Sequence, residues 1–127
     1  MIRGIGIDII ENARIHRIFA RFGYLFAEKI LSSNELKEFS NAQNKPNFLA
    51  KRFASKEALS KSIGIGLYRQ GLSPKIIEIR KDHLGKPNII ITDELKLILK
   101  KHSISKLHLS VSDTNNLSTA IVVAEDN

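Results

Sequence analysis

The chain has 127 residues, 43% hydrophobic and 26% charged, which indicates one globular domain with one core and excludes a disordered segment. It contains no cysteine, which excludes disulfides and thiolate metal sites and fits a reducing cytoplasm. The formal net charge of +7 favours anionic partners such as nucleic acids, phosphorylated cofactors and acidic proteins.

The N-terminal segment predicts a strand over residues 2–8. Ile5 and Ile7 face one side, and Gly4, Gly6 and Asp8 face the other. Glycine within a strand indicates the close approach of another backbone or of a ligand. The apolar run is soon interrupted by charges, so we expect neither a membrane span nor a secretion signal, but a soluble cytoplasmic protein.

An amphipathic helix is predicted over residues 11–22. Its apolar stripe is formed by Ile15, Ile18, Phe19 and Phe22. A second, basic stripe is formed by Arg14, Arg17 and Arg21. The latter is either a solvated face or a docking surface for an acidic partner.

Two more helices follow. Ser32 and Glu35 have the spacing of a capping box, which predicts a short helix to about Phe39. A long helix is predicted from Pro46 to about Ile63, with Gly64 as its end.

The second half of the chain reads mainly as strands. Residues 76–80 and 88–91 predict two strands joined by a turn around residues 85–87. Thr92 or Asp93 can cap a helix to about Lys101, and residues 106–112 and 119–124 predict a closing hairpin. We therefore predict an α+β fold, with a mostly antiparallel sheet packed against a long helix, in one domain spanning residues 1–127.

Two carboxylates stand at poorly solvated positions. Glu57 continues the line of Leu49 and Phe53 at a spacing of four residues, and Asp8 ends an apolar strand. A buried, ionised carboxylate is costly unless it is paired or binds a metal. Each also has a purely structural interpretation, Asp8 as a helix cap and Glu57 as a partner of Lys61.

If the two acids meet, they form a site for Mg²⁺, which is typically held by one or two carboxylates together with substrate phosphates. Arg52, Lys56 and Lys61 would then supply positive charge for a phosphate ester. The segment Gly64-Ile-Gly66 could present backbone N–H groups to a phosphate, or could simply end the helix.

Two sequence motifs resemble those of a known family. The segment Gly4-Ile-Gly-Ile-Asp-Ile-Ile-Glu11 resembles the N-terminal signature of holo-acyl-carrier-protein synthases, in the 4′-phosphopantetheinyl transferase superfamily. The segment Phe48-Leu-Ala-Lys-Arg-Phe-Ala-Ser-Lys-Glu-Ala-Leu-Ser-Lys61 resembles their second signature. Weaker matches follow at residues 64–66, 82–87 and 107–113, so the resemblance spans the whole chain.

The resemblance implies a 4′-phosphopantetheinyl transferase fold, a homotrimer with active sites between subunits, and a role in fatty acid biosynthesis. The implied reaction transfers 4′-phosphopantetheine from coenzyme A to a serine of apo-acyl carrier protein and releases adenosine 3′,5′-bisphosphate. Neither a nucleic acid nor a membrane is an expected partner.

The resemblance also implies roles for individual residues. Mg²⁺ ligands are Asp8 and Glu57, and the catalytic residues are Glu57 and Lys61. Coenzyme A contacts are assigned to Arg52, Lys61, Gly64, Gly66 and His108. Carrier-protein contacts are assigned to Arg14, Ile18 and Arg21. The general base is either Glu57 or a water molecule held by the metal.

Two other classes of function are compatible with parts of the sequence. A basic module that binds nucleic acid explains the charge but not the two carboxylate signatures, and salt-sensitive retention on DNA would favour it. A protein that keeps the fold without activity is disfavoured because Asp8, Glu57 and Lys61 are all present.

Overall fold

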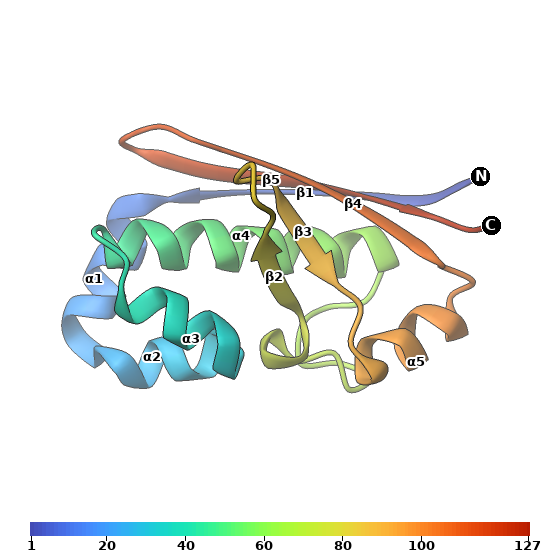
Figure 1. The fold of residues 1–127 in the computed structure, drawn as a ribbon, viewed down its shortest axis with the longest axis horizontal. Coiled ribbons are helices and arrows are strands. Elements are labelled where there is room, and N and C mark those ends of the chain that lie inside the picture. The colour runs from blue at the N-terminus through green and yellow to red at the C-terminus, as the bar shows by residue number, and fades with distance from the viewer.

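A three-stranded sheet and one long helix form the centre of the fold. The structure is a computed structural model and describes residues 1–127. Strand β1 (Ile2–Glu11) pairs antiparallel with β5 (Leu117–Glu125), and β5 pairs antiparallel with β4 (Lys106–Asp113). Helix α4 (Lys45–Ile63) runs along the inner face of this sheet (Figure 1).

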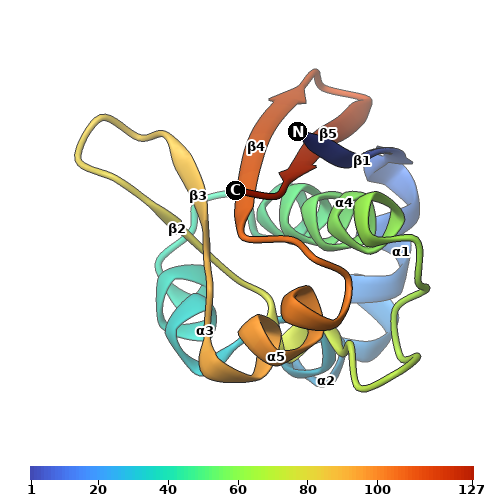
Figure 2. The same cartoon turned by 90° about the vertical axis from the view of Figure 1, so that its right-hand side faces the viewer.

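Shorter elements surround α4. Helices α1 (Asn12–Phe22), α2 (Tyr24–Ile30) and α3 (Ser33–Ser40) lie toward one end of it, and α5 (Asp93–Lys101) lies toward the other (Figure 1). After the short 3-10 turn η1 (Pro74–Ile76), strands β2 (Glu78–Lys81) and β3 (Pro87–Ile90) form a separate antiparallel hairpin. This hairpin projects from the body of the molecule (Figure 2).

The predicted α+β class is confirmed, with differences in detail. The strands form two separate antiparallel sheets, and β1 runs three residues beyond the predicted end, from Asp8 to Glu11. Helix α2 was not predicted. It begins directly after Gly23, whose φ of 58° lets the chain reverse between α1 and α2.

The helix boundaries predicted from capping residues are confirmed. The Ser32 hydroxyl accepts a hydrogen bond from the Glu35 N–H, and the Glu35 carboxylate accepts one from the Ser32 N–H. Helix α4 ends at Gly64, which has a left-handed φ of 91°.

Strand β1 lies unusually close to α4, which explains two of its glycines. A Cβ atom on Gly4 would lie 1.9 Å from the Ser62 carbonyl oxygen, and one on Gly6 would lie 1.9 Å from that of Ala58. The close approach predicted for these glycines is therefore that of a helix backbone. The same face of β1 carries Asp8 two residues later, so Asp8 also points toward α4.

Candidate active site

The contact between β1 and α4 brings together Asp8, Glu57 and Lys61. The Lys61 ammonium donates hydrogen bonds to Asp8 Oδ1 at 3.1 Å and to the Ile7 carbonyl oxygen at 3.0 Å. Glu57 lies one helical turn before Lys61 on α4, and its carboxylate is close enough to Asp8 for the two charges to interact. Two acids and one base thus form a cluster at the edge of the sheet.

The protonation of Glu57 reflects this environment. Partial burial raises the pKa of Glu57 above its usual range, and the negative charge of Asp8 raises it further. The positive charge of Lys61 offsets part of this rise. The Glu57 carboxylate makes neither an ion pair nor a hydrogen bond, so it is a half-buried acid without a direct partner.

The chemistry of this donor set fits a small divalent cation. Asp8 and Glu57 offer oxygen ligands of the kind that Mg²⁺ prefers, and two carboxylates are the usual protein contribution when phosphates complete the coordination. A cation already lies against Asp8 in the form of the Lys61 ammonium. With both acids ionised, the cluster carries two negative charges against one positive charge, so it can attract a further cation.

Lys56 does not belong to this cluster, and its prediction as a phosphate neighbour is wrong. Its side chain is fully buried on the far side of α4, where the ammonium pairs with the Glu35 carboxylate. It also donates hydrogen bonds to the carbonyl oxygens of Ile30 at 2.6 Å and Pro74 at 2.9 Å. Burial lowers the pKa of Lys56, although the charge of Glu35 opposes this. Lys56 ties α3, the end of α2 and η1 to α4.

Arg52 belongs to the same buried network. Its guanidinium donates to Glu35 Oε2 at 3.1 Å, to Glu38 Oε2 at 3.0 Å and to the Ile79 carbonyl oxygen at 2.6 Å. The side chain is only 5% exposed and stacks on the ring of Phe48. Most of its hydrogen-bonding capacity is thus used within the protein.

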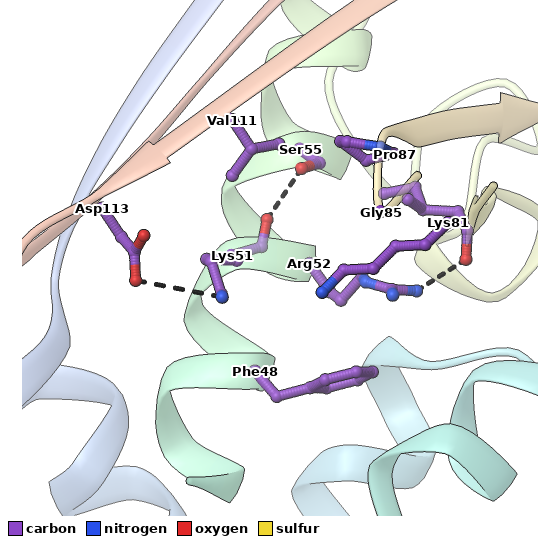
Figure 3. A pocket seen from close by; sticks show the side chains of 10 residues that line it. Phe48, Lys51, Arg52, Ser55, Lys81, Gly85, Pro87, Val111 and Asp113 are labelled. Carbon is purple, nitrogen blue, oxygen red and sulfur yellow. Dashed lines mark hydrogen bonds and ion pairs between the residues drawn. The ribbon is translucent and has the colours of Figure 1, made fainter. Parts of the chain in front are cut away.

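A small cleft opens beside Arg52, between α4, the β2–β3 hairpin and β4 (Figure 3). Phe48, Pro87 and Val111 give it an apolar lining, and Lys51 and Lys81 extend into it. Its volume is about 170 Å³. This is below the range of about 300–1,000 Å³ that is typical of sites for drug-sized ligands, so this cleft by itself offers at most part of a site for a larger molecule.

The two lysines of the cleft were not predicted as site residues. The Lys51 ammonium lies 3.9 Å from the Asp113 carboxylate, and Lys81 makes no ion pair. Lys51 lies within the second signature and Lys81 directly precedes the matched segment at residues 82–87. The nearness of both lysines to matched motifs was a signal in the sequence that they could belong to a site. Only the fold shows that the two lysines line one cleft.

His108 lies away from the Asp8 cluster within the chain. It is on the outer face of β4, opposite Val123 of β5, whereas Asp8 is on the inner face of β1. Its Nε2 lies 2.6 Å from Glu125 Oε2. The sheet therefore separates His108 from Lys61 in a single chain.

The glycine pair after α4 mainly ends the helix. The Gly64 N–H donates to the Ser60 carbonyl oxygen, so it is already used at the helix end. Gly66 follows in the exposed part of the loop, and its contact with coenzyme A stays a prediction.

The predicted docking residues share one face of α1. Arg14 and Arg21 are exposed and make no ion pair, and Ile18 between them is half-buried. The exposed ring of Phe22 lies against Arg21 beside this face. The face combines positive charge with apolar area, as a protein-binding surface does.

Comparison with known proteins identifies the family. The family model of the 4′-phosphopantetheinyl transferase superfamily matches residues 4–122, which include both carboxylates and the cleft. The chain belongs to the 4′-phosphopantetheinyl transferase superfamily. The fold and the family expected from the two motifs are thereby confirmed.

Among members of this superfamily, holo-[acyl-carrier-protein] synthases are similar to this chain over its full length. That of Blochmanniella pennsylvanica is 43% identical, covering 98% of this chain and 99% of the relative. The crystal structure of the Neisseria meningitidis synthase has a TM-score of 0.93 and 44% identity, covering 99% of this chain and 100% of that chain. A synthase from Bacillus anthracis in complex with CoA (3′,5′-ADP) has a TM-score of 0.83 and 36% identity, covering 100% and 99%.

Proposed function

We propose that this chain is a holo-[acyl-carrier-protein] synthase. It transfers the 4′-phosphopantetheine arm of coenzyme A to a serine of apo-acyl carrier protein and releases adenosine 3′,5′-bisphosphate. The observation that carries the proposal is the cluster of Asp8, Glu57 and Lys61 in a chain that matches such synthases end to end. The Bacillus anthracis structure, with its bound CoA, supports the choice of substrate.

In this proposal Asp8 and Glu57 hold Mg²⁺, whose charge would neutralise the diphosphate and assist departure of the leaving group. Lys61 adds positive charge beside the same phosphates. Its side chain is 53% exposed, so it can reach a ligand outside the protein surface. The general base that takes the serine proton is proposed to be either Glu57 or a water molecule that the cation would hold.

The cleft supports a second contact with coenzyme A, at the nucleotide end. Its apolar lining suits a flat ring, and Lys51 and Lys81 suit a phosphate. Arg52 then acts mainly by holding the wall of the cleft in place, since Glu35 and Glu38 already occupy its guanidinium.

We infer that the active protein is a homotrimer with shared sites. The outer face of the sheet exposes a continuous set of apolar side chains, namely Ile5, Ile7, Ile9, Leu117 and Ile121. Apolar surface of this kind is typical of a protein interface. Because His108 lies on that same outer face, covering it with a second copy would bring His108 to a neighbour's site.

The carrier protein is proposed to dock on α1 through Arg14, Ile18 and Arg21, because acyl carrier proteins present acidic surfaces. We place the reaction in the cytoplasm and in fatty acid biosynthesis. No helix of the structure combines the length and the apolar character that crossing a bilayer requires.

The test is a mass measurement on the carrier protein. Purified chain is incubated with coenzyme A, Mg²⁺ and apo-acyl carrier protein, and the carrier protein should gain the mass of one phosphopantetheine arm. Asp8→Ala and Glu57→Ala should each lower turnover by about a hundredfold or more, because each removes a proposed ligand of the cation, and both should leave the circular dichroism spectrum unchanged. An unmodified carrier protein under these conditions would refute the proposal.

A further inference from the structure

Lys61 already serves as the cation of the Asp8 cluster. Its ammonium bridges α4 to β1 through one carboxylate oxygen of Asp8 and one backbone carbonyl oxygen. The Asp8 side chain is only 16% exposed and has no other ion pair. Half of the lysine side chain, by contrast, is in contact with solvent, so its ammonium can leave without disturbing the core.

The ammonium and a divalent cation cannot both occupy this place at low cost. Both would lie against the same carboxylate of Asp8, and two positive charges that close together repel each other strongly. Glu57 has no ion pair of its own, so the pair of acids can accept more positive charge than one lysine supplies.

We propose that Lys61 is a resident counter-ion that competes with the divalent cation for Asp8, and that the diphosphate of coenzyme A draws the lysine away. Metal and coenzyme A then strengthen each other's binding. This inference rests on the proposed function, because it takes Asp8 and Glu57 as the cation ligands.

The physical reason is an exchange of partners. Without coenzyme A, a metal ion must displace Lys61 from Asp8 and leaves the ammonium unpaired. With coenzyme A present, the phosphates offer the ammonium a new anionic partner, so the displacement costs less. Because coupling between two ligands is reciprocal, the metal must tighten coenzyme A binding by the same factor.

The experiment measures Mn²⁺ binding by electron paramagnetic resonance, with and without coenzyme A, and needs no turnover. In the absence of coenzyme A, Lys61→Met should bind Mn²⁺ about three- to tenfold more tightly than the parent protein. Lys61→Arg keeps the charge and should bind like the parent. In Lys61→Met, coenzyme A should strengthen Mn²⁺ binding by a smaller factor than in the parent.

Lys51→Met is the matched control. Lys51 lies on the same helix and near a different aspartate, so its loss changes the net charge equally without touching Asp8. Without coenzyme A it should leave Mn²⁺ affinity within twofold of the parent.

Two results would overturn the inference in different ways. Equal or weaker Mn²⁺ binding by Lys61→Met, with clear binding by the parent, would refute the competition and leave the metal site standing. No Mn²⁺ binding by any variant, with or without coenzyme A, would refute both the competition and the proposed roles of Asp8 and Glu57.

Discussion

At the scale of single residues, the candidate site places charged side chains at positions that lower the stability of the fold. Glu57 is half-buried, close to the charge of Asp8, and has no ion pair. Such an arrangement destabilises the metal-free protein and favours any ligand that brings positive charge. Site residues of this kind commonly trade stability for function.

Replacing Glu57 should therefore stabilise the metal-free fold. The folded state raises the pKa of Glu57 above the ordinary value of 4.5, so the folded protein holds its proton more tightly than the unfolded chain does. Stability from this group is full below pH 4.5 and is lost as pH rises through the raised folded pKa. Glu57→Gln should remove this loss. The free energy of unfolding should then rise by up to about 1 kcal/mol at pH 7.5, after discounting for solvent screening.

The measurement is urea unfolding in chelator at pH 4 and pH 7.5. Glu57→Gln and the parent protein should differ less at pH 4 than at pH 7.5. A variant that is equally destabilised at both pH values would show that the Glu57 carboxylate is instead a structural contact of the native fold.

At the scale of elements, α4 separates two groups of charges on different sides. One side places Glu57 and Lys61 against β1, and another holds Arg52 and Lys56 in a closed network with Glu35. The buried network is neutral in sum when Glu38 is included, and all its members are hydrogen-bonded. It attaches α3 and the base of the β2–β3 hairpin to α4, which keeps the wall of the cleft in place.

Helix α1 provides a test of docking that is separate from chemistry. Charge reversal, Arg14→Glu with Arg21→Glu, should raise the KM for carrier protein about tenfold or more, because each exposed arginine contributes roughly 1 kcal/mol to an electrostatic contact. Coenzyme A binding should be unchanged, since the proposed cofactor contacts lie on other elements. Steady-state kinetics with carrier protein and calorimetry with coenzyme A check the two expectations.

A second basic pair on another helix controls for net charge. Lys96 and Lys100 are exposed and lie one helical turn apart on α5, so Lys96→Glu with Lys100→Glu changes the total charge equally. This variant should keep the parent's KM for carrier protein. If the α1 variant also does so, the arginines form only a solvated face.

At the scale of the whole molecule, the sheet has one covered and one open face. The inner face packs on α4 (Figure 1). The outer face presents isoleucine side chains to solvent on β1 and β5. These side chains are 39–62% exposed, so covering each would contribute part of the about 1.5–3 kcal/mol that full burial gives, which favours association.

Ile121 is central to this face and tests the assembly. It lies on the middle strand, paired with Ile7 on one side and Ser110 on the other. Ile121→Lys should convert a trimer into monomers in sedimentation velocity and lower turnover at least tenfold, because a charge cannot be buried at an apolar interface at low cost. Leu97→Lys introduces the same charge at another exposed apolar position, on α5, and should leave assembly intact. A fully active monomeric parent would contradict the shared site.

The sequence by itself determined the local structure and the family. Ser32 with Glu35 predicted the start of α3, Gly64 predicted the end of α4, and the alternation at residues 2–8 predicted which side of β1 carries Asp8. Capping, helix termination and strand alternation depend on residues close together in the chain, so they can be read from local patterns. The two motifs also pointed to the superfamily that the comparisons confirm.

Only the tertiary structure decided which charges meet. Asp8 and Lys61 are 53 positions apart, and their ion pair forms because two glycines let β1 lie directly on α4. Lys56 sits only five positions from Lys61 on the same helix, yet it is buried against Glu35. His108 lies on the opposite face of the sheet from Lys61 within one chain, so a coenzyme A site that includes both residues needs His108 from a neighbouring copy. Partners of this kind are set by long-range packing and by the direction in which each side chain leaves its element, and helical spacing alone does not contain that information.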